Sequence, residues 1–541
     1  MPFRQYAYEL LMRTYAFLFF TFLMCFYSLG QQNALIGKVL DANTNEPLVF
    51  ATVRIQNTNI GVITDDDGIF RLPYRYKQNK DILEISFIGY ETKTFPTTAM
   101  NDGEITIIKV TTQIEALGTI TLKHKKKTLT AEQIVRKAIA NVPRNLPANS
   151  NAYIGYYRDY KLIDDEYHNL NEALIEVFDS GIQTDKLRNI YNQSVLYSYS
   201  LNDDFKRNAI LDNPYDNDDN KFINDAKITA FGGNELTILD IHNPIRNYKA
   251  FSFSFIDVLE NDFVNNHSFT IEEKTALGKI PIYKISFKGN HSSRDYKYRV
   301  QGDLYIQQGN YAIHKMSYNV DQAYVLTSDV VAYSSRGTVQ KINLEFIPYY
   351  GLKLEYTPIK DKMYLNYISF NNRFRLGVAN TFAVLDLIYD IKEQAIFIKF
   401  NNDVDFASQP ARFVNYSFRF KKEVLEPKEI EFLSKTLVKI SFDEDQIPKR
   451  LKNPRQLKHL KYELSGIEDV FGNEINVNES FDVYQFREFF VQEVFPRKGL
   501  PDDTQYIHKV KNLKKSTVYS TDDVIKTYWL NTPLKKIEGE E

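Results

Sequence analysis

Apolar and polar side chains alternate along much of this chain of 541 residues, and this alternation constrains its fold more than any other feature. Between Ala51 and Gln56 the apolar residues occupy every second position, and the pattern returns between Leu83 and Phe87. A period of two is typical of β-strands that bury one face. The 37 Tyr and 38 Phe agree, because aromatic side chains pack well on a pleated sheet. We therefore expect a mainly β protein.

Residues 1–30 have the features of a secretory signal peptide. Arg4 and Arg13 precede an uncharged apolar stretch that ends in a small-x-small site at Gly30. We predict cleavage between Gly30 and Gln31, and with it export to the periplasm. An uncleaved membrane anchor is the alternative, although the apolar run is short for a bilayer span of about 20 residues.

The chain contains one cysteine, Cys25, and it lies inside this predicted signal. Met24 precedes it, whereas a lipoprotein signal needs a small residue there, so we expect no lipidation. The mature protein would then have no disulfide, no thiolate metal ligand and no cysteine nucleophile. The net charge of −2 also gives no strong field for nucleic acid.

The segment GKVLDANTNEPLVFATVRIQNTNIGVITDDDGIFRLP, followed by LEISFIGYETKTF, carries glycine, proline, aspartate and aromatic residues in a recognisable order. On these positions residues 34–112 resemble a carboxypeptidase regulatory-like domain of the Bacteroidetes type. The resemblance implies a seven-stranded, transthyretin-like Greek-key β-sandwich that is an accessory module without catalytic residues. Such modules commonly head outer-membrane receptors and periplasmic proteins. The positions that carry the resemblance are Gly37, Asp41, Pro47, Ala51, Thr64, Asp65, Gly68, Phe70, Gly89 and Tyr90.

Three consecutive aspartates, Asp65 to Asp67, lie within this module. A cation held by two or more of them is one interpretation. Asp67 followed by Gly68 is also a strong hairpin signal, because both residues tolerate the backbone angles of a tight turn. We interpret the acidic run as a turn where two strands reverse.

A lysine-rich linker follows the module and leads into a predicted helix. The lysines could contact anionic lipid or a partner, and a solvated linker is the alternative. Thr130 and Gln133 are spaced as a capping box, and apolar residues then recur on one face, which predicts a helix over residues 130–142. The lysines are Lys123, Lys125, Lys126 and Lys127.

Longer alternating segments between residues 151 and 425 predict a larger antiparallel β domain. Residues 307–310 are typical of a hairpin turn, with Gly309 available for positive φ. In its strand rhythm this section resembles the curved half-barrel of periplasmic lipoprotein carriers. Its aromatic side chains could line a pocket for a lipid or a carbohydrate, although core packing accounts for such rings equally well.

The last part of the chain has a mixed pattern. Asn453 and Pro454 can begin a helix and Gly466 can end it. Leu457, Leu460 and Leu464 would share one of its faces. We expect five regions: a signal peptide (1–30), the β-sandwich (31–115), a linker and helix (116–150), the antiparallel β domain (151–425) and a mixed α/β C-terminal region (426–541).

Motifs of the common enzyme classes are missing. None of the eight histidines has a glutamate three residues on, so the zinc carboxypeptidase pair is absent, as are a Gly-x-Ser-x-Gly elbow and a Walker A loop. The acidic run at residues 212–219 fails as a calcium loop because Lys221 stands where glycine is needed. Two distant carboxylates of a glycosidase would leave no signature, so a hydrolase stays the third alternative.

We therefore predict a non-enzymatic periplasmic accessory protein that is associated with outer-membrane transport, secretion or barrel-assembly complexes. It would bind an outer-membrane protein and need no cofactor, metal or nucleic acid. We expect no transmembrane span after signal cleavage. A periplasmic lipid- or carbohydrate-binding protein is the main alternative.

Overall fold

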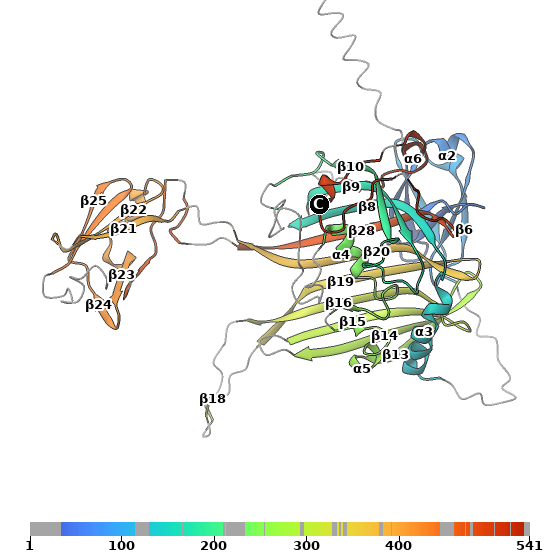
Figure 1. The fold of residues 1–541 in the computed structure, drawn as a ribbon, viewed down its shortest axis with the longest axis horizontal. Coiled ribbons are helices and arrows are strands. Elements are labelled where there is room, and N and C mark those ends of the chain that lie inside the picture. The colour runs from blue at the N-terminus through green and yellow to red at the C-terminus, as the bar shows by residue number, and fades with distance from the viewer. Residues whose placement is uncertain are drawn as a thin grey trace, which may run out of the picture. The chain divides into compact units, whose positions relative to one another are not determined.

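The computed structural model describes the chain in two compact units, formed by residues 1–373 with 484–541 and by residues 374–483 (Figure 1). The predicted cleavage site at Gly30 and Gln31, the lysine run 123–127 and the acidic run 212–219 lie outside the described residues. The described residues are 34–113, 129–163, 166–208, 211, 233–253, 255–292, 297–326, 333–334, 337–338, 343–377, 382–390, 392–443, 459–470, 472–476, 480–502, 504–519 and 521–534.

Seven strands in two sheets form the N-terminal sandwich, as the sequence predicted. Its strands are Ala34–Asp41 (β1), Thr52–Ile55 (β2), Gly61–Ile63 (β3), Ile69–Pro73 (β4), Ile82–Ser86 (β5), Lys93–Pro96 (β6) and Ile105–Val110 (β7), with the short helices Arg75–Gln78 (α2) and Thr97–Ala99 (η2). The sheets have the orders β4-β1-β7 and β3-β2-β5-β6. Val39, Val53, Phe70 and Leu83 point inward and belong to one core, so alternation buries one face of each sheet.

The acidic run forms the predicted turn, but the turn does not make a hairpin. Gly68 has a φ of 72°, and its amide donates to the Asp65 carbonyl at 3.0 Å. The flanking strands belong to different sheets, because β3 pairs with β2 and β4 pairs with β1. The predicted pairing is therefore wrong. An Asp-Gly turn satisfies the backbone equally well where the chain crosses between two sheets, so the local signal does not specify the partner strand.

The predicted helix is confirmed as α3, Ala131–Asn145. The amide of Gln133 donates to Thr130 Oγ1 at 3.2 Å, and the Thr130 amide donates to Gln133 Oε1 at 3.1 Å, which completes the capping box. Its buried face, including Ile134 and Val135, packs on the large sheet described next.

An open ten-stranded sheet has the order β10-β9-β8-β28-β20-β19-β16-β15-β14-β13. It confirms the predicted antiparallel β domain, and Gly309 has a φ of 99° in the predicted turn between β15 and β16. The strands are Asn151–Ile163 (β8), Glu166–Asp179 (β9), Gln193–Leu201 (β10), Ser268–Leu277 (β13), Ile280–Ser292 (β14), Lys297–Gln307 (β15), Ile313–Leu326 (β16), Asn343–Ile359 (β19), Lys362–Gly377 (β20) and Ser480–Phe495 (β28). Two short hairpins are Phe251–Phe253 (β11) with Asp257–Val258 (β12) and Tyr333–Ser334 (β17) with Gly337–Thr338 (β18).

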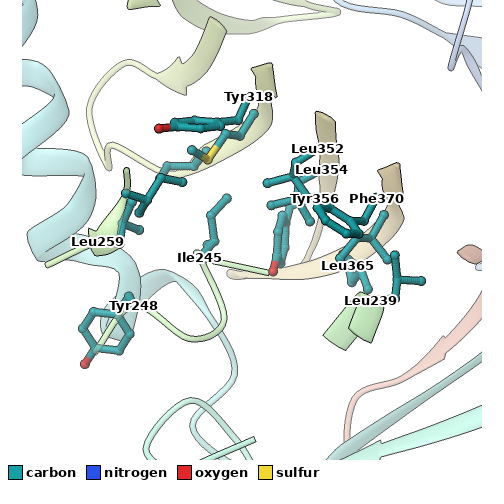
Figure 2. Packing of buried hydrophobic residues seen from close by; sticks show 14 of the residues in the cluster. Leu239, Ile245, Tyr248, Leu259, Tyr318, Leu352, Leu354, Tyr356, Leu365 and Phe370 are labelled. Atoms are coloured by element: carbon teal, nitrogen blue, oxygen red, sulfur yellow. The ribbon is translucent and has the colours of Figure 1, made fainter. Parts of the chain in front are cut away.

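Helices cover one face of this sheet. The helices α3, Glu235–Ile241 (α4) and Phe263–Asn266 (α5) share one apolar core with its strands. Figure 2 shows Ile245 and Leu259 of the connecting segments near Tyr318, Leu354 and Tyr356 of the sheet. The sandwich covers the other face, where Phe50 and Ile63 pack with Tyr156, Tyr367 and Phe490.

Residues 374–483 form a smaller all-β unit, inserted between β20 and β28. These two strands are neighbours in the large sheet, so the insertion replaces the connection between them. The strands are Val384–Asp390 (β21), Ala395–Phe400 (β22), Tyr416–Phe420 (β23), Glu423–Leu425 (β24), Glu429–Ser434 (β25), Leu437–Ser441 (β26) and Leu460–Leu464 (β27). They form the sheets β21-β22-β26-β25 and β24-β23-β27 around a core of their own. We call this unit the inserted unit.

Two expectations for this part of the chain are corrected. The division at residue 425 falls inside the inserted unit, and β28 from the predicted C-terminal region belongs to the large sheet. The predicted helix over 453–466 is also wrong, because Leu460–Leu464 is a strand that pairs with β23. Leu460 and Leu464 are four residues apart, and that spacing keeps two side chains on one face of either a helix or a strand. Residues 453–458 lie outside the described residues.

The C-terminal segment joins the sandwich to the sheet. It contains Leu513–Lys515 (η7) and Asp522–Thr527 (α6), and the Trp529 side chain then enters the sandwich core. The indole N–H donates to the Arg71 carbonyl at 2.8 Å. Gln492 of β28 holds the backbone of Trp529 from the sheet side, because its Nε2 donates to the carbonyl at 2.7 Å and its Oε1 accepts the amide at 3.2 Å.

We expect Gln492→Ala to loosen this segment. The two backbone groups of Trp529 lose their buried partners, which should lower the free energy of unfolding by about 1–3 kcal/mol. Trp529 is the one tryptophan of the chain, so its fluorescence reports the change directly. The emission should shift to longer wavelength and become easier to quench with acrylamide. Gln301→Ala, at an exposed position of β15, is the control. Identical emission in the two variants would contradict the expectation.

Candidate functional site

The ten positions that carry the family resemblance lie in the sandwich, and each has a structural role there. Asp41 closes a turn, since its Oδ1 accepts the amides of Asn43 at 2.6 Å and Thr44 at 2.9 Å. Its Oδ2 accepts the Tyr90 hydroxyl at 2.6 Å. The bond from Tyr90, followed by the two amides, holds the pKa of Asp41 below its usual value. Burial and the same bond raise the pKa of Tyr90 to about 12.

The glycines allow close approach. A Cβ at Gly37 would lie 2.2 Å from the Phe70 ring, so this ring packs directly over the glycine backbone. Gly89 has a φ of 89°, and its amide donates to the Ala276 carbonyl of β13 at 2.8 Å. Gly89 is therefore a contact between the sandwich and the large sheet.

The remaining positions fix the loop before β2. Pro47 bridges to Leu40, and the amide of the fully buried Ala51 donates to Thr64 Oγ1 at 2.8 Å. The Thr64 hydroxyl in turn donates to the Leu48 carbonyl at 2.5 Å.

The aspartates of the acidic run have separate partners. The buried Asp65 carboxylate accepts the amides of Asp67 at 3.1 Å and Ile69 at 2.8 Å. Asp66 forms an ion pair with Lys353 of β19 at 3.3 Å. Burial raises the pKa of Asp65 to about 6, although the charge of Arg158 in the sheet below opposes this rise. Across the described ranges, no group of three His, Cys, Asp or Glu side chains is placed to hold a metal ion.

Charged residues are buried in the large sheet where the sandwich covers it. Arg158 of β8 donates through Nε to Glu488 of β28 at 2.5 Å, and their side chains are 1% and 3% exposed. The other Glu488 oxygen accepts the Tyr367 hydroxyl at 2.5 Å. The Arg158 guanidinium lies 5.0 Å from the ring centre of Phe490. A charge pair inside a sheet is stable only with such partners, because desolvation of each ion costs several kcal/mol.

A cleft of about 260 Å³ lies between the sandwich and the large sheet. We call it the sandwich cleft. Lys315 of β16 pairs with Glu355 of β19 at 2.9 Å, and Arg54 of β2 donates to Thr357 at 3.1 Å. Burial raises the pKa of Glu355 and lowers that of Arg54. The further lining residues with aromatic or ionisable side chains are Phe50, Glu84, Phe87, Tyr305, His314 and Tyr356.

Two properties decide what this cleft can bind. Its charges balance, since Arg54 and Lys315 face Glu84 and Glu355. Aromatic rings surround the Lys315 ammonium, whose nitrogen lies 5.4 Å from the ring centre of Phe87. Clefts at domain junctions that combine apolar rings with a few polar groups are common ligand sites. A neutral polar ligand suits this lining better than an ion.

Sequence reasoning did not identify these residues as a site. Arg54 and Glu84 were only polar positions of alternating strands, and Lys315 and Glu355 come from a distant part of the chain. The sequence contains one signal for the buried pair. The tyrosines around Arg158 occupy both faces of β8, whereas a half-exposed strand would alternate apolar and polar residues.

The fold contains a seven-stranded β-sandwich module that is built into a larger β protein, and comparison with known proteins gives the class of the module. Residues 35–122 match the CarboxypepD_reg-like domain, which confirms the resemblance seen in the sequence. The chain is also 40% identical over 70 residues to the TonB-dependent receptor SusC of Bacteroides thetaiotaomicron. That alignment covers 13% of this chain and 7% of the receptor. No solved structure matches the chain. No helix among the described residues is long and apolar enough to cross a membrane.

Replacing Asp65 with Asn should change the pH dependence of stability. The pKa of Asp65 is about 6 in the folded protein against about 3.9 in an unfolded chain, so the folded state binds more protons between these values. The free energy of unfolding of the wild type therefore falls as the pH rises through this window. Asp65→Asn removes that fall, so the variant should gain about 2–3 kcal/mol relative to the wild type between about pH 4 and pH 8 in urea unfolding.

The matched control is Asp67→Asn, which changes an exposed aspartate of the same turn. The charge of Asp67 raises the pKa of Asp65 less than burial does, so this variant should keep most of the wild-type fall in stability across the same pH range. Parallel curves for all three proteins would show that burial of Asp65 has no effect on its titration.

Proposed function

We propose that this protein is a non-enzymatic periplasmic accessory protein that binds an outer-membrane protein in a transport, secretion or barrel-assembly complex. The module match and the likeness of part of the chain to a TonB-dependent receptor together support this compartment. The observation that carries the binding function is the apolar surface of the inserted unit.

Exposed apolar side chains are concentrated on the inserted unit. Within the described residues, nine of the nineteen large apolar side chains with high exposure lie between residues 374 and 483. Exposed apolar groups of this kind are typical of protein interfaces, whose centres are depleted of charge. The nine are Leu385, Ile388, Phe406, Phe413, Val414, Val424, Leu433, Tyr462 and Val470.

Several of these residues come from neighbouring segments at the connection between β22 and β23. Phe406 begins the helix Phe406–Ser408 (η4), and its ring packs edge-on against Phe432 with 5.1 Å between the ring centres. The Val470 amide donates to the Asp403 carbonyl at 3.0 Å. Phe413 and Val414, in Phe413–Asn415 (η5), are 54% and 73% exposed. We call Phe406, Phe413, Val414 and Val470 the loop surface.

The double variant Phe413→Ser/Val414→Ser should disrupt partner binding. The full chain, tagged and expressed in its native envelope, is cross-linked, solubilised mildly and analysed by quantitative mass spectrometry. An outer-membrane protein should be enriched with the wild type. The variant should recover about tenfold less of it, since a central interface residue contributes about 1–2 kcal/mol or more.

The control Ile190→Ser/Tyr191→Ser removes two apolar side chains that are 71% and 61% exposed outside the inserted unit. It should recover the partner as the wild type does. Absence of any enriched envelope protein would contradict the proposed function. Equal recovery with all three proteins would contradict the loop surface as its site.

The sandwich cleft favours a second candidate, a carbohydrate-binding protein. The sequence allowed either a lipid or a carbohydrate as the ligand. The balanced charges and the surrounding rings of this cleft suit a neutral sugar more than a lipid. In thermal unfolding against a panel of soluble oligosaccharides, we expect at least one to raise the Tm of the wild type and not of Phe87→Ala. Ile82→Ala, at an exposed position of the neighbouring strand β5, should respond as the wild type does. A panel without any shift would contradict this candidate.

A further inference from the structure

A bulge in β16 directs a histidine into the sandwich cleft. In the pairing of β16 with β15, Lys315 stands opposite Tyr305. Ile313 stands opposite the next residue, Ile306, so His314 is an extra residue with no residue opposite it. Successive side chains of a regular strand point to opposite faces of a sheet. Here His314 and Lys315 both line the cleft, and the bulge explains how two neighbours reach the same side.

Only one ring nitrogen of His314 has a partner within the protein. The residue is 2% exposed, and its Nε2 lies 3.2 Å from Gln307 Oε1. An amide oxygen only accepts hydrogen bonds, so Nε2 carries the ring proton. Burial lowers the pKa of His314 to about 4, so the ring is neutral at pH 7 and Nδ1 keeps its lone pair. This buried Nδ1 has no hydrogen-bond partner among the described residues.

An unpartnered acceptor at the wall of a cleft favours a ligand that donates to it. Burial has removed Nδ1 from water, and a donor on the ligand would restore the missing hydrogen bond. The charges of the lining are compensated, because Lys315 pairs with Glu355 at 2.9 Å and Arg54 interacts with Glu84. A lining without excess charge suits a neutral hydroxyl group better than an ammonium group.

The size and the rings of the cleft limit the ligand further. Its volume of about 260 Å³ is just below the range of about 300–1,000 Å³ that is typical of sites for drug-sized ligands. A single sugar ring therefore matches the cleft better than a long chain. Phe87 and Tyr305 add aromatic surface against which the apolar side of a sugar ring can pack.

We propose that the sandwich cleft binds a single neutral sugar ring through a hydroxyl group that donates to His314 Nδ1. This inference rests on the carbohydrate-binding candidate described above, and it identifies the residue that selects the ligand. Gln307 is a positioning residue in this site, because it fixes the ring proton on Nε2 and leaves Nδ1 as the acceptor.

Two substitutions of His314 separate ligand binding from a structural role. The side-chain amide of His314→Gln can still donate to Gln307, but no acceptor remains at the position of Nδ1. The side-chain oxygen of His314→Asn lies near the position of Nδ1, but the contact with Gln307 is lost. In urea unfolding His314→Gln should be the more stable variant, whereas His314→Asn should be the better binder. A structural role alone would give stability and binding the same order.

The probes are the methyl α-glycosides of D-glucose, D-galactose and D-mannose, titrated calorimetrically into the full chain. At least one should bind the wild type, with about tenfold weaker binding to His314→Gln and a loss of about threefold or less for His314→Asn. His508→Gln, which changes an exposed histidine outside the cleft lining, is the control and should bind as the wild type does. Equal binding by the wild type and a folded His314→Gln would overturn the inference and leave the carbohydrate candidate in place. Failure of all three glycosides to bind the wild type would overturn both.

Monodeoxy derivatives of the glycoside that binds identify the hydroxyl group. One of them should bind the wild type about tenfold more weakly than the parent glycoside does, because Nδ1 then has no donor. The same derivative should bind His314→Gln as tightly as the parent glycoside does, since the two changes remove one interaction. Equal losses with both proteins for every derivative would overturn the role of His314.

Discussion

The packing of the sandwich on β8, β28 and β20 decides most of the remaining structure. Helices already cover the opposite face of these strands, so the sandwich makes the centre of the sheet a middle layer. All residues of β8 from Asn151 to Lys161 are buried as a result. Phe50 stacks on Tyr367 with 4.7 Å between ring centres, and Trp529 reaches back into the sandwich core. The module is therefore part of a shared core and is not a domain on a linker.

Charged groups in a middle layer need a partner, because burial removes them from water. Arg158 pairs with Glu488 on the sandwich side, and Arg487 pairs with Glu235 of α4 on the helix side. Removing one partner of a buried pair typically costs about 3–5 kcal/mol, because the remaining charge stays in the interior. Both arginine pairs involve β28, which follows the inserted unit. They fix the register of that strand after a long excursion of the chain, and the sheet can therefore accommodate an insertion between β20 and β28.

Local features were predictable from the sequence, and long-range ones were not. The capping box of Thr130 and Gln133 and the turn at Gly309 depend on a few adjacent residues, so both were predicted correctly. The pairing of β4 and the strand at Leu460 were predicted wrongly, because an Asp-Gly turn and a four-residue spacing are each compatible with two structures. The inserted unit has the same alternation as the large sheet, and no local signal separates them. The sandwich cleft is lined by residues from two distant parts of the chain, and the alternating pattern identifies its charged residues only as polar positions.

Two lysines of the same unit show two ways in which the fold compensates a buried positive charge. Lys315 has Glu355 at 2.9 Å and aromatic rings around its ammonium, so its charge is satisfied within the fold. Lys186 is equally well enclosed, but the carboxylate nearest to it is bound by Arg246. A second carboxylate, Asp240, also interacts with Lys186, so two carboxylates compensate the charges of Lys186 and Arg246 together. Lys315 is therefore satisfied by one carboxylate at hydrogen-bonding distance, whereas Lys186 belongs to a network of buried charges that balances as a whole.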